Sequence, residues 1–312
     1  MSRFSWQDIV EAQKVIDPVF LNSPQYEYEP LNAVLGARVI LKVETQNPIR
    51  SFKGRGADLL VSQAKQPIIC ASAGNFGQAM AYATRKRALP LTILASVNAN
   101  PFKVKRMQDL GAEVLLHGVD FDDAKIFARE LAIEKNLRFV EDSADVETAI
   151  GAGTIGLELL SHPAEIQCVL VAVGNGALIN GVGKAFKENN PDTTVIGVQA
   201  SGAPAMIESW KSNSIISYPT INTIADGIGV RMPVPEALTD MKEVIDEGLL
   251  VSEDFILKAM KLLYRVAGLV SEPSGAIAIA AILEYPTLFR NKTVAAIICG
   301  SNLTDEQLKN WL

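Results

Sequence analysis

Ser51-Phe52-Lys53-Gly54-Arg55-Gly56-Ala57 is the stretch that decides the fold. An apolar run at residues 39–43 precedes it and predicts a strand, and residues 57–61 after it predict a helix. The small residues beside Lys53 leave room for a flat ligand. The positive end of the helix dipole favours an uncharged amine here, which covalent chemistry with a carbonyl group needs. Most lysines are solvated surface residues, so this stretch decides nothing until the rest of the chain is considered.

Short apolar runs alternate with helical stretches along most of the chain. Strands are expected at residues 68–71, 91–95, 113–116, 137–140, 169–173, 195–199 and 294–298. These runs are nearly continuous in apolar residues, as strands buried on both faces of a parallel sheet are. Helices are expected between them, for example over 78–87, 101–110 and 122–135. The alternation predicts an α/β fold with right-handed crossovers and parallel sheets.

Composition narrows the class of protein. The chain has 312 residues, of which 48% are hydrophobic, and a net charge of −6. That length supports two lobes, and the acidic balance argues against a nucleic-acid surface. No apolar run reaches the roughly 18 residues of a membrane span. The 3 cysteines and 2 histidines show no metal-ligand spacing, so we expect no metal site and a location in the reducing cytoplasm.

The turn Gly174-Asn175-Gly176-Ala177-Leu178 follows a predicted strand and opens a predicted helix. Backbone N–H groups at such a place bind anions, so the turn predicts a phosphate site, although a tight turn alone is a weak signal. A dinucleotide site would need an acidic residue at the end of the next strand, where this chain has Gln199. We therefore expect a mononucleotide-sized phosphate and not NAD.

A second turn, Ser72-Ala73-Gly74-Asn75-Phe76, offers a hydroxyl, an amide and several backbone donors that suit a carboxylate. The alternative is that Ser72 or Asn75 caps a helix.

Cys299 follows the last predicted strand and either faces a ring or packs as a small buried hydrophobe. Glu272 precedes Pro273, where a negative charge at a helix start is also favoured.

Together these stretches resemble the fold type II pyridoxal-phosphate enzymes, and within them the serine/threonine dehydratase family. Besides the stretches quoted above, the resemblance includes residues 111–114, Gly151-x-Gly153-Thr154, Ala225-Asp226-Gly227, residues 272–276 and residues 299–302. The resemblance implies a fold like that of the tryptophan synthase β-subunit, with two lobes that each hold a mainly parallel sheet flanked by helices. We expect a large lobe over residues 1–66 and 145–312 and a small inserted lobe over residues 67–144.

The resemblance also implies the roles of the site residues and a pyridoxal 5'-phosphate cofactor. Lys53 looks like the catalytic lysine that carries the cofactor covalently, and Asn75 like the contact to its ring hydroxyl. The turn from Gly174 to Leu178 looks like the phosphate loop, and Cys299 like the neighbour of the pyridine nitrogen. Ser72, Ala73, Gly74, Asn75 and Phe76 look like the loop that holds the substrate carboxylate. Phe52, Gly227 and Glu272 are expected as further cofactor contacts.

The implied activity is deamination of a 3-hydroxy amino acid, such as L-threonine or L-serine, to a 2-oxo acid and ammonia. Ala73 stands where related racemases have an acid/base serine, and Gln199 and Ala205 where they bind a cation, so we expect little racemisation and no metal. Alternatives are threonine synthesis or β-replacement, against which Gly54 and Phe76 argue, and a non-catalytic protein that binds the cofactor. A small amino-acid substrate, a homodimer, and neither nucleic-acid nor membrane partners are expected.

Overall fold

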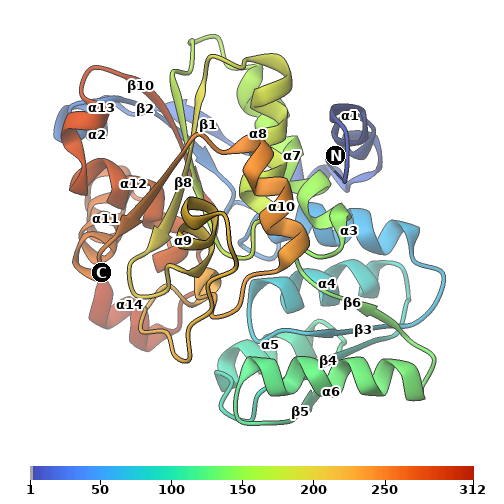
Figure 1. The fold of residues 1–312 in the computed structure, drawn as a ribbon. Helices are drawn as coiled ribbons and strands as arrows, with labels where there is room; N and C mark the ends of the chain where they lie inside the picture. Colours follow the sequence, from blue (N-terminus) through green and yellow to red (C-terminus); the bar gives the residue numbers. More distant parts are fainter. Residues whose placement is uncertain (1–2) are drawn as a thin grey trace.

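The computed structural model describes residues 3–312, which form two sheets (Figure 1). The large sheet has the order β1 (Gln25–Glu27), β2 (Arg38–Val43), β10 (Thr293–Ile298), β7 (Cys168–Ala172), β8 (Thr194–Ala200) and β9 (Glu247–Val251). The small sheet has the order β5 (Glu113–Leu116), β4 (Leu91–Ala95), β3 (Ile68–Ala71) and β6 (Arg138–Val140). Every neighbouring pair is parallel except β1 with β2. The expected α/β class with two mainly parallel sheets is confirmed.

Helices connect the strands and cover the sheets (Figure 1). Those that lead into and cover the small sheet are α3 (Lys53–Gln63), α4 (Asn75–Lys86), α5 (Pro101–Asp109) and α6 (Phe121–Glu134). Those of the large lobe are α1 (Trp6–Val15), α2 (Glu29–Leu35), α7 (Val146–Leu160), α8 (Ala177–Asn189), α9 (Ala205–Ser212), α10 (Pro235–Val244), α11 (Glu253–Ala267), α12 (Pro273–Glu284), α13 (Pro286–Phe289) and α14 (Asp305–Trp311). Two 3-10 turns, η1 (Pro18–Phe20) and η2 (Asp226–Ile228), complete the set.

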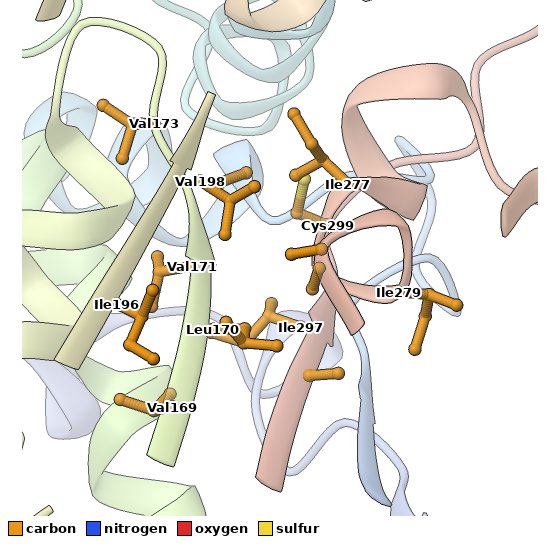
Figure 2. Close-up of a cluster of buried hydrophobic side chains, with 14 of the residues drawn as sticks. Val169, Leu170, Val171, Val173, Ile196, Val198, Ile277, Ile279, Ile297 and Cys299 are labelled. Carbon is orange, nitrogen blue, oxygen red and sulfur yellow. The ribbon is translucent and has the colours of Figure 1, made fainter. Parts of the chain in front are cut away.

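The main core lies in the middle of the large sheet. Figure 2 shows Val169, Leu170 and Val171 of β7 packed among side chains of β8, β10 and α12. All five residues of β7 are buried, because β7 is a central strand that packs against both α8 and α12. This packing sets the carboxyl ends of β7 and β10 side by side, and the glycine turn and Cys299 follow those ends.

Three elements differ from the sequence-based expectation. Strand β1 is antiparallel and polar, and β9 carries Glu247 and Gly248, so neither has the continuous apolar run of a central strand. Both lie at the edges of the large sheet, where that run is not required. Helix α3 begins at Lys53 itself, four residues earlier than expected. The lysine is therefore the first helical residue and not part of a preceding loop.

The lobe boundaries at residues 66/67 and 144/145 stay a prediction. Among residues 3–312, no helix combines the length and the apolar character needed to cross a membrane.

Candidate active site

A cavity of about 590 Å³ lies where the ends of strands from both sheets come together. Every site residue expected from the sequence lines it: Phe52, Lys53, Ser72, Ala73, Gly74, Asn75, Phe76, Gly174, Asn175, Gly176, Ala177, Leu178, Gly227, Glu272 and Cys299. These residues come from stretches up to 247 positions apart, that is, from Phe52 to Cys299. The fold therefore gathers the predicted set at one place, while their roles stay proposals.

Lys53 extends into this cavity from the first position of α3. Its neighbour Gly54 packs against Phe20, and a Cβ at Gly54 would lie 2.2 Å from the Phe20 ring. The amine Nζ lies 2.6 Å from Oδ2 of Asp142 and 4.7 Å from the centre of the Phe52 ring. Sequence reasoning missed Asp142, which follows β6 and lies 89 positions from Lys53. No local motif marks a contact of that separation.

A buried ionic cluster holds α3 in place two residues beyond Lys53. The Arg55 guanidinium donates to Glu44 at 2.8–2.9 Å and to Glu158 at 2.5–2.9 Å. Lys42 of β2 donates to the same Glu158 at 2.5 Å. Two cations and two carboxylates balance in the interior, where an unpaired charge would cost several kcal/mol (roughly 3–5). The cluster therefore ties the start of α3 to β2 and α7.

The predicted phosphate loop forms the entry to α8. Gly176 has φ +106°, a conformation that glycine adopts without the strain a side chain would bring. The N–H of Ala177 donates to the Ser143 hydroxyl at 3.2 Å. Within residues 3–312 the Oδ1 atom of Asn175 is buried and has no hydrogen-bond partner. The turn thus presents a helix N-terminus and an unpaired polar atom to the cavity.

In the predicted carboxylate loop, Ser72 stabilises the helix that follows. Its hydroxyl accepts hydrogen bonds from the N–H groups of Gly77 at 2.9 Å and Gly74 at 3.3 Å. Ser72 therefore stabilises the first turn of α4, as the capping alternative proposed, although Gly74 occupies the cap position itself. Asn75 caps nothing, because its side chain points to the large lobe.

The half-buried Asn75 joins a network with the buried Glu272 and Asn302. Asn75 donates through Nδ2 to Oε1 of Glu272 at 2.6 Å, and it accepts from Nδ2 of Asn302 at 2.8 Å. The Asn302 backbone N–H donates to Oε2 of Glu272 at 2.9 Å. Burial, reinforced by the charge of Asp226, raises the pKa of Glu272 to about 7. The network links the small lobe to the large lobe at the cavity wall.

Cys299 and Ser274 also line the cavity. The Cys299 thiol lies 3.4 Å from the Ser274 carbonyl oxygen, and burial raises its pKa, with a contribution from Glu272. The thiol is therefore a neutral neighbour for a ligand ring. The Ser274 hydroxyl is buried and has no hydrogen-bond partner within residues 3–312.

Ion pairs cross from lobe to lobe around the cavity. Lys103 pairs with Asp226, and Arg231 pairs with Asp122. Arg106 donates to Oδ1 of Asn302 at 2.6 Å. None of these contacts was expected from the sequence, since each joins residues more than 100 positions apart.

The residues present fit a phosphorylated aromatic aldehyde. A reactive amine, a helix N-terminus for an anion and a neutral thiol for a ring face one cavity. Three lining residues, Asp142, Asn175 and Ser274, carry buried polar atoms that lack a partner within the described chain. Such atoms are costly in an apolar setting and indicate a polar ligand. Among residues 3–312, no three His, Cys, Asp or Glu side chains gather as a metal site would require.

Comparison with known proteins gives consistent results. A family model described as "Pyridoxal-phosphate dependent enzyme" matches residues 16–300. The L-threonine ammonia-lyase of Thermotoga maritima is 34% identical over 95% of this chain and 75% of its own length. A catabolic L-threonine dehydratase of Staphylococcus aureus is 34% identical over 95% of this chain and 88% of its own.

Solved structures are similar as well. Threonine deaminase isoform 2 from Solanum lycopersicum, in its processed form, superposes with a TM-score of 0.89 at 30% identity, covering 98% of this chain and 93% of the other. Maize serine racemase superposes with a TM-score of 0.90 at 27% identity, covering 98% of this chain and 97% of the other.

Proposed function

The chain belongs to the family of pyridoxal-phosphate dependent enzymes, and we propose that it deaminates a 3-hydroxy amino acid, such as L-threonine or L-serine, to a 2-oxo acid and ammonia. The observation that carries this proposal is that Lys53, the glycine turn before α8 and the loop Ser72 to Phe76 line one cavity. An amine for covalent attachment, an anion site for a phosphate and a second anion site for a carboxylate are the parts this reaction needs.

Each group has a task that follows from its place. The turn from Gly174 to Leu178 would hold the cofactor phosphate, and Cys299 and Asn75 would contact its ring. The bound cofactor supplies an electron sink that makes the α-proton of an amino acid acidic. Lys53 would carry the cofactor and then take that proton at Nζ. The loop Ser72 to Phe76 would orient the substrate by its carboxylate.

The neutral thiol of Cys299 favours elimination over slower carbanion chemistry. A neutral partner leaves the ring nitrogen without a proton and so tempers its electron-sink strength. Elimination tolerates this, because loss of the 3-hydroxyl relieves the developing charge. Threonine synthesis and β-replacement are less well supported, because Gly54 and Phe76 differ from the residues that enzymes of those two kinds usually have at these positions.

Purified protein supplied with pyridoxal 5'-phosphate tests the proposal directly. We expect an absorbance band near the edge of the visible range, and release of ammonia and a 2-oxo acid from threonine or serine in a panel of amino acids. Lys53→Ala removes both signals. The matched control is Lys105→Ala, which changes an exposed lysine of α5 that pairs with Asp109 of its own helix. Borohydride reduction followed by peptide mapping is expected to label Lys53, and a label elsewhere contradicts the assignment.

A cytoplasmic location and a homodimer are further parts of this proposal. The three cysteines, Cys70, Cys168 and Cys299, are unpaired and buried, which suits a reducing compartment. Light scattering of the purified protein measures the oligomeric state, and a monomer at micromolar concentration removes the homodimer.

A further inference from the structure

Asp142 is the acidic residue nearest to the amine that the proposed reaction uses. Its Oδ2 lies 2.6 Å from Nζ of Lys53, and its Oδ1 is buried without a hydrogen-bond partner within residues 3–312. The side chain lines the cavity and is 23% exposed. One oxygen thus binds the lysine while the other has no protein partner.

The other carboxylates of the cavity are already held by groups that do not react. Glu272 accepts from Asn75 and Asn302, and Asp226 pairs with Lys103. Asp120 and Asp122 both pair with Arg231. Asp142 differs because its partner is Lys53, which must leave it to form a covalent bond. A ligand that occupies Lys53 therefore frees this carboxylate within reach of the reacting nitrogen.

The backbone beside Asp142 is held in an unfavourable conformation. Ser143 has φ +72°, a left-handed value that costs a non-glycine residue about 1–3 kcal/mol. Three contacts fix it: its N–H donates to Thr148 Oγ1 at 3.1 Å, its hydroxyl accepts from Ala177 at 3.2 Å, and its carbonyl accepts from Arg3 at 3.1 Å. The carboxylate of Asp142 is therefore aimed at Lys53 by the same loop that contacts the start of α8.

We propose that Asp142 is a catalytic acid–base residue, which transfers protons between the amine of the incoming substrate and Nζ of Lys53. The inference rests on the proposed function. As the substrate nitrogen replaces Lys53, a C=N bond to the substrate forms and the C=N bond to Nζ breaks. The incoming ammonium group would lose two protons. The Asp142 carboxylate would accept each in turn, returning one to Nζ, which leaves as the neutral amine that can take the α-proton, and releasing the other to water. No further reactant is required.

Exchange with glycine isolates this step, because glycine has no 3-substituent to eliminate. Stopped-flow absorbance of the reconstituted protein measures the rate at which glycine replaces Lys53 on the cofactor. We expect Asp142→Ala to slow the exchange by about 10²-fold, the usual contribution of a positioned acid–base group. We expect added formate to raise the exchange rate of Asp142→Ala at least about tenfold, since it fits the space vacated by the carboxylate. The rate of covalent cofactor uptake by cofactor-free protein is a second readout.

Two further variants keep the test decisive. Asp142→Asn has nearly the same shape and no base, so it is expected to be slow and not restored by formate. Glu141→Ala removes the adjacent carboxylate, which is not among the cavity-lining residues and pairs with Lys125 and Arg129, and is expected to exchange within about threefold of the wild type. A wild-type rate in Asp142→Asn, or a slow Asp142→Ala that formate leaves unchanged, overturns the proposal. Failure to release ammonia would instead count against the proposed substrate class, because glycine exchange remains measurable.

Discussion

Asn75, at the first position of α4 in the small lobe, donates to Glu272 of the large lobe across 2.6 Å in the cavity wall. The two residues lie 197 positions apart in sequence. The contact places a buried carboxyl group directly behind the amide that is proposed to touch the cofactor ring. The protonation of Glu272 and the position of Asn75 are therefore coupled.

Glu272 is expected to make the stability of the cofactor-free protein depend on pH. Its pKa is about 7 in the folded state against 4.5 for the ordinary group, so the folded protein keeps a proton that the unfolded chain releases. The stability that Glu272 contributes by keeping this proton is fully present below about pH 4.5 and is lost as pH rises through 7. Relative to Glu272→Gln, the wild type should lose roughly 2–3 kcal/mol of unfolding free energy between pH 5 and pH 8. Urea unfolding measures it.

The control for that experiment is Glu134→Gln at the exposed end of α6, which should show no such difference. A constant gap between the wild type and Glu272→Gln from pH 5 to pH 8 would show that Glu272 titrates as an ordinary glutamate.

Gly176→Ala is expected to weaken cofactor binding. The φ of +106° strains any side chain there, and a Cβ would lie 3.2 Å from Nδ2 of Asn180. A distortion costing about 1.4 kcal/mol at the phosphate turn corresponds to a tenfold higher Kd for pyridoxal 5'-phosphate. Gly36→Ala is the matched control, since Gly36 has φ +64°, open space around it and no contact with the cavity. If both variants bind the cofactor equally well, the turn does not hold the phosphate.

Arg231→Gln is expected to raise KM with little change in kcat. Arg231 pairs with Asp122 across the cavity and lies 3.6 Å from Asp120, so it stabilises the arrangement in which the lobes enclose a ligand. Partly exposed ion pairs contribute about 0–1 kcal/mol, which limits the rise in KM to roughly fivefold. Steady-state kinetics at low and high salt check this, because salt should raise KM in the wild type and not in the variant. Lys105→Gln is the control, because it removes a surface ion pair within α5.

Ala73→Ser is expected to increase formation of D-serine from L-serine. Racemisation needs an acid/base group on each face of the planar carbanion, and Ala73, which lines the cavity, has no such group. Chiral analysis after long incubation should show a rise of about tenfold or more over a low wild-type level. Ala73→Val, which adds bulk without a titratable group, should show none. Efficient racemisation by the wild type would mean that another residue serves this face.

Sequence patterns were sufficient for the elements that depend on local chemistry. The apolar runs of β7 and β10 predict buried parallel strands, because a strand covered on both faces excludes polar side chains. The edge strands β1 and β9 escaped prediction for the same reason, since an edge tolerates Glu27 or Glu247. The glycine turn at Gly176 is also local, because its positive φ admits few other residues.

The pairing of Lys53 with Asp142, of Asn75 with Glu272 and of Arg231 with Asp122 was decided only by the tertiary structure. Each partner is an ordinary charged or polar residue in its own segment, and nothing in that segment specifies which distant side chain it meets. The order of strands in each sheet and the approach of the two lobes bring these residues within hydrogen-bond distance. The sequence alone identified many of the cavity-lining residues but not Asp142, Asp122 or Arg231. The fold determined which residues are coupled, because coupling depends on distance through space.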